Sequence, residues 1–258
     1  MSVEFEAPAW AQATLTRTHF KRLRFYWSGG RQDTFDGRPA SERGGASRTD
    51  GIDLELAGMG LIRRLHNVSI THFAITPAGE VALAHEHQRE IERRRPHHAL
   101  AGRLAQWLVA NGRVTWEGIE VRVSPANVAS ARKLLSLNDD HDAPTFVKPD
   151  VYSVEATGDP ARARSCVHEV KVSRADFLAD VANPAKRLGY ASCAEAVYYA
   201  CPAGVLSAAD MPHGCGLVVE TAPGHFEVLA RAKRRAIELD ARHYLTLMLK
   251  PFQLQPLA

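Results

Sequence analysis

The chain has 258 residues, of which 45% are hydrophobic and 24% charged, and a formal net charge of +3 at pH 7. This is the composition of a globular protein, with room for one large domain or two small ones. No apolar run approaches the ~20 residues that span a bilayer, and the start lacks the basic and apolar regions of a secretory signal. We therefore expect a cytoplasmic protein with no membrane partner. The net charge is too small to argue for a nucleic-acid partner, which local basic clusters would have to support.

The N-terminal part mixes basic and aromatic residues and then changes character. Residues 15–27 combine arginine and lysine with phenylalanine, tyrosine and tryptophan, whereas residues 28–51 carry six glycines and hardly an apolar side chain. A segment of that kind buries too little surface to offset its ordering entropy, so we expect a disordered loop at 28–51. Residues 52–65 have the spacing of a short helix that leads into an extended piece, and 68–76 alternate as a strand does.

A new helix is expected after this strand, because Thr76 is a good N-cap and Pro77 suits the first helical position. The order of short helix, wing-like strand and further helix resembles the closing part of a winged-helix module. This resemblance implies a nucleic-acid-binding module over residues 1–95. The charge run "REIERRRPHH" marks its expected boundary, and Pro96 is expected to start another helix.

From residue 96 onwards the pattern is that of an α/β layer with one twisted sheet. Helices are expected at 96–112, at 174–193 with a break near Asn183-Pro184, and at 234–250. Strands are expected at 113–123, 145–156, 165–173, 196–204, 215–221 and 225–232. The stretch 124–145 is expected to be irregular. The four cysteines, Cys166, Cys193, Cys201 and Cys215, contain no C-x-x-C pair and are expected to be reduced thiols.

Charged residues interrupt two of these apolar strands. "KPDVYSV" contains Asp150, and "CVHEVKVS" contains Glu169 with Lys171 two places on. Residues two apart in a strand face the same side, so Glu169 and Lys171 project together while His168 projects to the other face. If Asp150 lies on the neighbouring strand and faces the same way, two carboxylates and one ammonium meet at a single point.

Such a cluster needs a reason, because buried charges are costly unless they pair or bind a metal. Two carboxylates on adjacent strands suit Mg²⁺, which takes one or two protein carboxylates and keeps several waters. The lysine can then orient or deprotonate an attacking water, or stabilise charge that develops on a phosphate. The pattern indicates metal-assisted phosphodiester hydrolysis. The alternative is that Glu169 and Lys171 form only a same-face ion pair without function.

"PD" at Asp150 followed by "EVK" at Glu169 to Lys171 resembles the PD-(D/E)xK nuclease superfamily. The longer series "HEVKVSRADFLAD…KRLGY…CAEAVYYACPAG…GCGLVVE" is similar to the MmcB-like family of presumed DNA-repair nucleases. This resemblance covers residues 96 to about 250. It implies a restriction-endonuclease-like mixed sheet flanked by helices over 96–258, with Asp150 and Glu169 as ligands of Mg²⁺ or Mn²⁺ and Lys171 as the catalytic lysine. It also implies DNA as substrate, a role in DNA repair or in phage- or defence-related processing, and a possible homodimer.

The chain departs from the superfamily at the first core helix, which often adds a glutamate. Here that helix offers His97, His98 and Gln106 but no acid. Two sources of a third acidic ligand stay open: the preceding helix, if it runs on, and the first strand. The helix offers Glu86, Glu90 or Glu92, and the strand offers Glu117 or Glu120.

Other polar residues surround the motif. His168 is expected to be a packing residue, and Asp176 and Asp180, four apart on the following helix, are expected to cap and solvate it. Basic and aromatic groups near that helix are expected to hold phosphate and stack on a base: Arg174, Lys186, Arg187 and Tyr190.

Two functions from different classes fit these observations. The first is a Mg²⁺-dependent DNA nuclease in which residues 96–258 cut and residues 1–95 hold DNA. The second is a non-catalytic nucleic-acid-binding protein that keeps a nuclease-like fold as a scaffold. The missing helix glutamate favours the second, whereas the intact set of Asp150, Glu169 and Lys171 favours the first.

Overall fold

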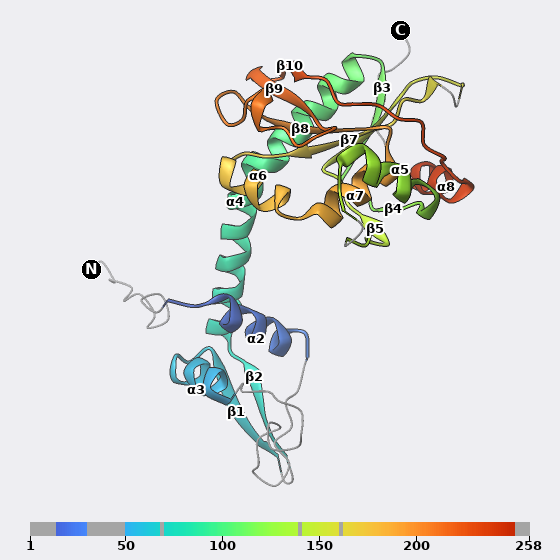
Figure 1. The fold of residues 1–258 in the computed structure, drawn as a ribbon. Coiled ribbons are helices and arrows are strands. Elements are labelled where there is room, and N and C mark those ends of the chain that lie inside the picture. The colour runs from blue at the N-terminus through green and yellow to red at the C-terminus, as the bar shows by residue number, and fades with distance from the viewer. Residues whose placement is uncertain (1–13, 30–49, 68–69, 139–140, 160–161, 251–258) are drawn as a thin grey trace. The chain divides into compact units, whose positions relative to one another are not determined.

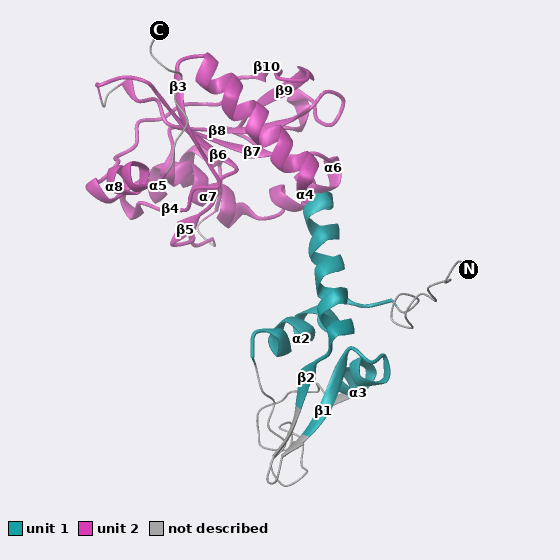
Figure 2. Ribbon diagram, turned by 180° about the vertical axis from the view of Figure 1, so that it is seen from behind, with its two compact units in different colours: residues 1–93 teal, residues 94–258 magenta. Residues whose placement is uncertain are grey.

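The computed structural model describes residues 14–29, 50–67, 70–138, 141–159 and 162–250 (Figure 1). Apart from its ends, the loop expected at 28–51 lies outside the described residues. The chain divides into two compact units, residues 1–93 and 94–258 (Figure 2). The division lies inside the expected charge run, close to the boundary inferred from the sequence.

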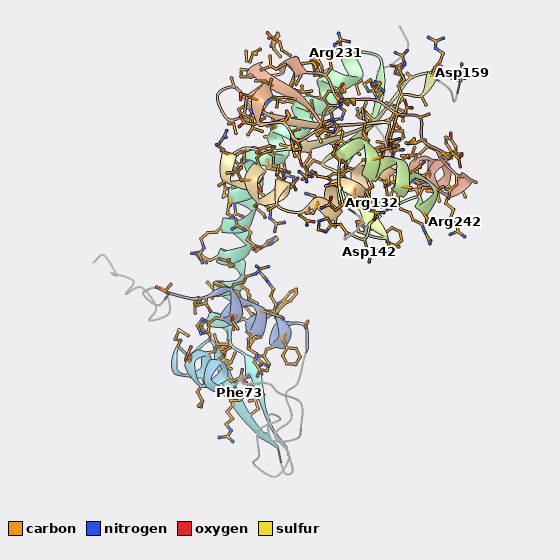
Figure 3. All side chains as sticks on the ribbon, in the orientation of Figure 1. Phe73, Arg132, Asp142, Asp159, Arg231 and Arg242 are labelled. Carbon is orange, nitrogen blue, oxygen red and sulfur yellow. The ribbon has the colours of Figure 1, made fainter. Side chains whose placement is uncertain are left out.

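Unit 1 is a small α+β unit built on one core. Its elements are α2 (Arg17–Trp27), α3 (Asp50–Gly58), the antiparallel hairpin of β1 (Ile62–Asn67) and β2 (Ile70–Ile75), and the first part of α4 (Pro77–Ala110). Thr16 caps α2 by accepting a hydrogen bond from the backbone N–H of His19. Phe20, Leu23 and Tyr26 of α2 are buried against α3 and the hairpin. Phe73 lies on β2 (Figure 3). Its ring packs on that of Tyr26, with centroids 6.2 Å apart.

Helix α4 differs from its expected form. Thr76 caps it as expected, through a 3.2 Å hydrogen bond from the N–H of Gly79 to its hydroxyl oxygen. The helix then continues through Pro96 instead of restarting there. An internal proline removes one backbone hydrogen bond and costs ~3 kcal/mol. Packing compensates for this cost, because Leu100, Leu104 and Leu108 beyond the proline are almost fully buried.

Unit 2 is a mixed sheet of six strands, flanked by helices, as expected. The strands are β3 (Arg113–Glu117), β6 (Val151–Glu155), β7 (Cys166–Val170), β8 (Ala196–Pro202), β9 (Gly216–Ala222) and β10 (His225–Ala230). The spatial order is β10-β9-β8-β7-β6-β3. The pairs β3–β6, β6–β7 and β9–β10 are antiparallel, whereas β7–β8 and β8–β9 are parallel.

Helices cover both faces of this sheet (Figures 1 and 2). The second part of α4 packs on the face that carries Val151, Val170 and Ala200. The opposite face, with Tyr152, Val167 and Tyr199, is covered by α5 (Pro125–Leu135), α6 (Arg174–Val181) and α7 (Pro184–Cys193). Asp150 directly precedes β6, and Glu169 is the next-to-last residue of β7. Their neighbours Val151, His168 and Val170 are buried, which fixes the direction of the two side chains.

Three local expectations were wrong. The stretch 124–145 contains α5, which begins at Pro125 after Ser124 and ends where Ser136 adopts a left-handed conformation (φ 53°). The expected strand 113–123 breaks at Gly118 (φ 56°), which turns the chain so that β4 (Val121–Arg122) pairs with β5 (Phe146–Val147) in a separate sheet. The last helix, α8 (Ala241–Leu249), begins only after its N-cap Asp240.

Two further findings concern the cysteines and membrane-spanning helices. The four cysteines are buried and free of disulfides. Over the described ranges, no helix has both the length and the apolar character needed to cross a membrane.

A bidentate ion pair joins α4 to the sheet. Arg103 donates to both carboxylate oxygens of Glu220 at 2.5 and 2.8 Å, and the N–H of Gly224 donates to the same carboxylate at 2.9 Å. Glu220 is 8% exposed. The hydrogen bond from Arg103 lowers the pKa of Glu220 below its ordinary value.

We expect Arg103→Ala to lower the free energy of unfolding at pH 7 by about 1 kcal/mol, because the partly exposed guanidinium is screened. Since the pKa of Glu220 is depressed, this contribution is present above the ordinary pKa of glutamate, ~4.3, and is lost as pH falls through the folded-state value. Urea unfolding at neutral pH and near pH 3 measures both effects. Arg89→Ala, which removes a surface pair with Glu86, is the control. Equal losses in the two variants, or a loss that persists at low pH, would contradict this role.

Candidate active site

The strand register brings the motif residues together. β6 and β7 pair with Val151 opposite His168 and Tyr152 opposite Val167. One further step along the antiparallel ladder places Asp150 opposite Glu169. Alternation then directs Glu169 to the face covered by α6 and α7, and Lys171 follows on the same side. Asp150, Glu169 and Lys171 therefore meet at one end of the β6–β7 pair, as the alternation predicted.

Glu169 is the centre of the cluster. It is 4% exposed, and its Oε1 accepts hydrogen bonds from Lys171 Nζ at 2.9 Å and Lys186 Nζ at 2.5 Å. Its Oε2 accepts from the hydroxyl of Tyr190 at 2.7 Å. Burial raises the pKa of Glu169, and the charge of Asp150 raises it further, against the opposing effect of the two lysines. The ammonium groups of Lys171 and Lys186 thus stabilise the ionised form of Glu169 against burial and the charge of Asp150.

Asp180 is a second buried carboxylate that shares the same two lysines. Its Oδ1 lies 2.5 Å from Lys186 Nζ and 3.3 Å from Lys171 Nζ, and its Oδ2 accepts from the hydroxyl of Tyr199 at 3.0 Å. Burial alone would raise the pKa of Asp180, but the hydrogen bond and charge of Lys186 outweigh it and hold the pKa below its ordinary value. Asp180 therefore remains an anion.

Both lysines remain protonated in this arrangement. Burial would lower the pKa of Lys171, but the charge and hydrogen bond of Glu169 outweigh burial and raise it above its ordinary value. The same balance, with Glu169 and Asp180, raises the pKa of Lys186. Lys171 is consequently an ammonium group, which can stabilise negative charge but has no free lone pair with which to accept a proton.

Asp180 and Lys186 lie on either side of the turn between α6 and α7. Ser173 caps α6 by accepting from the N–H of Asp176, and Asn183 caps α7 by accepting from the N–H of Lys186. Asp180 lies in the last turn of α6, and Lys186 in the first turn of α7. Close packing holds α7 in place, because a Cβ on Gly189 would lie 2.6 Å from Val147 Cγ1.

Asp150 is held from two sides. Its Oδ2 accepts the backbone N–H of Val170 at 2.7 Å and lies 3.2 Å from His97 Nε2 of α4. The hydrogen bond with Asp150 raises the pKa of His97. His97 thus links α4 to the carboxylate of Asp150.

The other acids proposed as ligands lie differently. Glu117 ends β3 opposite Val151, on the face that α4 covers, and Glu120 is exposed in the turn between β3 and β4. Among the described residues, no group of three or more histidine, cysteine, aspartate or glutamate side chains is arranged to hold a metal ion. The candidate metal donors at the end of the β6–β7 pair are the carboxylates of Asp150 and Glu169 and the imidazole of His97.

The residues expected to bind DNA are divided by the structure. Arg174 is exposed and donates to Asp210 at 2.6 Å, and Arg187 is partly buried. Lys186 belongs to the Glu169 cluster, although a third of its side chain is exposed. The stacking role expected for Tyr190 was wrong in this structure: the residue is 1% exposed, so its ring offers no face to a base, and its hydroxyl supports Glu169 instead.

Sequence reasoning also misplaced Asp180, which was expected to solvate its helix, and it did not identify Tyr199. The alternation of "AVYYACP" was the available signal for Tyr199, because it places this hydroxyl on the same face as Glu169 of the neighbouring strand. His168 behaves as expected. It is buried, stacks on Tyr198 with ring centroids 5.6 Å apart, and has its pKa lowered to about 3 by burial.

Comparison of the chain with protein-family models, with curated proteins and with solved structures finds no match.

Proposed function

We propose that the chain is a metal-dependent nuclease that hydrolyses phosphodiester bonds in DNA. The observation that carries this proposal is the convergence of Asp150, Glu169 and the protonated Lys171 at the end of two adjacent strands. A mixed sheet flanked by helices is also the architecture that the PD-(D/E)xK resemblance implies for a restriction-endonuclease-like domain. Unit 1, in which two helices precede a hairpin and a further helix, is proposed to be a winged-helix-like module that binds the nucleic acid.

The donor set fits a hard divalent cation. The carboxylates of Asp150, Glu169 and Asp180, together with that of Asp176 at 3.8 Å from Lys171, outnumber the ammonium groups of Lys171 and Lys186 by four to two, so the cluster favours an additional positive charge. The raised pKa of Glu169 has burial and Asp150 as its causes, and a cation near both carboxylates would relieve this cost. Oxygen donors suit Mg²⁺ or Mn²⁺, and the imidazole of His97 is compatible with Mn²⁺.

The residues of this chain divide the work of hydrolysis. Asp150 and Glu169 would hold the cation, which when bound would activate a water and offset charge on the phosphate. Tyr190 and Val170 fix the two carboxylates by donating one hydrogen bond to each. Lys171 supplies a positive charge where the phosphate becomes more negative, a contribution typically worth several kcal/mol in a site shielded from water. Its protonation favours this electrostatic role over that of a general base.

The alternative, a non-catalytic nucleic-acid-binding scaffold, is favoured by one observation. Both oxygens of Glu169 already accept hydrogen bonds from protein donors, and Asp180 is similarly satisfied. A cluster satisfied in this way can serve as a buried structural network without any metal.

Cleavage assays separate the two functions. We expect Glu169→Gln and Lys171→Ala to reduce metal-dependent cleavage at least about 100-fold, because each removes a group that acts on the reacting phosphate or its metal. DNA binding should change little. The assay uses single-stranded, nicked, flapped and supercoiled DNA with Mg²⁺ or Mn²⁺, and Glu227→Ala on the exposed side of β10 is the matched control. Wild-type cutting by both variants would show that the site is wrong, and binding without cutting by the unmodified protein would favour the scaffold.

Metal binding can be measured without activity. We expect titration with Mn²⁺, followed by electron paramagnetic resonance, to show binding that Asp150→Asn and Glu169→Gln abolish. His97→Ala should weaken this binding about tenfold, because His97 contacts Asp150 directly. His225→Ala, an exposed histidine on β10, is the control. Equal Mn²⁺ affinity in all four variants would remove Asp150, Glu169 and His97 from the proposed metal site.

A further inference from the structure

Helices α2 and α3 of unit 1 carry opposite charge. α2 contains Arg17, Lys21, Arg22 and Arg24 and no acid, whereas α3 contains Asp50, Asp53 and Glu55 and no lysine or arginine. α3 directly precedes the β1–β2 hairpin, the position of the helix that would face DNA in a winged-helix-like module. Its charge opposes a phosphate backbone, whereas the charge of α2 attracts one.

The exposed side of α2 combines cations with aromatic rings. Its buried side faces the core of unit 1 through Phe20, Leu23 and Tyr26. The opposite side, here called the α2 face, consists of Arg17, Thr18, Lys21, Arg24, Phe25 and Trp27, all of which are exposed. Trp27 is 65% exposed and Phe25 is 39% exposed. Large apolar side chains so exposed beside positive charges are typical of a binding surface.

The cations of this face differ in their availability. Arg24 lies 3.6 Å from Glu90 of α4, and Arg22 lies 3.5 Å from the buried Asp53. In the described part of unit 1, no carboxylate lies within ion-pair distance of Arg17 or Lys21. These two side chains lie four positions apart on the helix and therefore point the same way. As far as the described residues of unit 1 extend, both can therefore pair with an external anion without losing an internal partner.

A pocket adjoins this face. It has a volume of about 300 Å³ and is lined by Thr18, Lys21, Arg22, Phe25 and Ile52. The Arg22 guanidinium lies 5.6 Å from the centroid of the Phe25 ring, and the Phe25 and Tyr26 rings meet edge to face at 5.3 Å. These contacts hold the Phe25 ring in place beside Lys21. A planar base and its phosphate need this combination of an aromatic wall and an ammonium group.

We propose that the α2 face binds single-stranded nucleic acid, with Arg17 and Lys21 on phosphates and Phe25 and Trp27 stacking on unpaired bases. Bases in a duplex are stacked inside the helix and offer no face to these rings, which favours a single strand. A membrane surface fits less well, because the apolar side of α2 is already packed in the core and its exposed rings lie among the cations. The proposal rests on the proposed function only in that both assume a nucleic-acid ligand.

Binding of two oligomers by the full-length protein in EDTA tests this directly, because no cleavage occurs without metal. The probes are fluorescent oligothymidylate and a strand of equal length made of abasic sites, which has the phosphates but no bases. Trp27→Ala and Phe25→Ala should each weaken oligothymidylate binding at least about fivefold and leave binding of the abasic strand unchanged. Lys21→Ala and Arg17→Ala should weaken both probes, and each should reduce the salt slope by about 0.7.

Two exposed residues outside the α2 face serve as controls. Tyr244→Ala, an aromatic residue of α8 that is 41% exposed, and Arg89→Ala should leave both affinities unchanged. The proposal is overturned if the aromatic variants bind oligothymidylate as the unmodified protein does. It is also overturned if duplex of equal length, polyglutamate or anionic vesicles compete better than oligothymidylate. Binding by this surface together with failure of cleavage in Mg²⁺ and Mn²⁺ would refute the nuclease proposal and leave this one standing.

Discussion

The arrangement of unit 2 around its site depends on the burial of one carboxylate. Glu169 lies in the middle of the sheet, in a strand whose residues are all buried, where an isolated charge costs several kcal/mol. Lys171, Lys186 and Tyr190 offset this cost, and they come from two parts of the chain. The strand supplies the first, and α7 must lie against the sheet to supply the other two. The other side of α7 is also closely packed, since a side chain at Gly189 would collide with Val147 of β5 and with Pro144.

The cluster around Glu169 is either a metal site or a purely structural network. The two interpretations differ in whether a cation would replace some of the hydrogen bonds that Glu169 accepts. A purely structural network needs no surplus of negative charge, yet the carboxylates exceed the ammonium groups by two when Asp150 and Asp176 are included. Asp150 and His97 are also 20% and 25% exposed, so this edge of the cluster is open to solvent. Of the two lysines, Lys186 is 32% exposed and Lys171 is 5% exposed. Exchanging Lys186 for a solvated cation therefore costs less than exchanging Lys171.

The part of the site that follows from the sequence is the part fixed by strand alternation. A period of two places Glu169 with Lys171 and away from His168, and an antiparallel neighbour brings Asp150 opposite. Asp180 and Tyr190 enter through the packing of α6 and α7 on the sheet, and a pattern within one helix contains no information about that approach. Pro96 and Gly118 are two positions where the local sequence pattern predicted the wrong element boundary. Packing on the sheet stabilises α4 although it contains Pro96. The left-handed conformation of Gly118 interrupts the segment 113–123, which alternates as a single strand would.

Phosphate chemistry at Glu169 would act alike on any nucleic acid, because every strand carries the same phosphodiester. Discrimination must therefore come from groups that contact the bases. In the described residues of unit 1, the exposed aromatic rings lie on α2, whose other side is fixed in the core by Phe20 and Leu23. A helix held in this way presents Phe25 and Trp27 with little freedom to lose on binding, so stacking is not offset by ordering of the helix. If both proposals hold, unit 1 selects unpaired bases and unit 2 hydrolyses the phosphodiester bond.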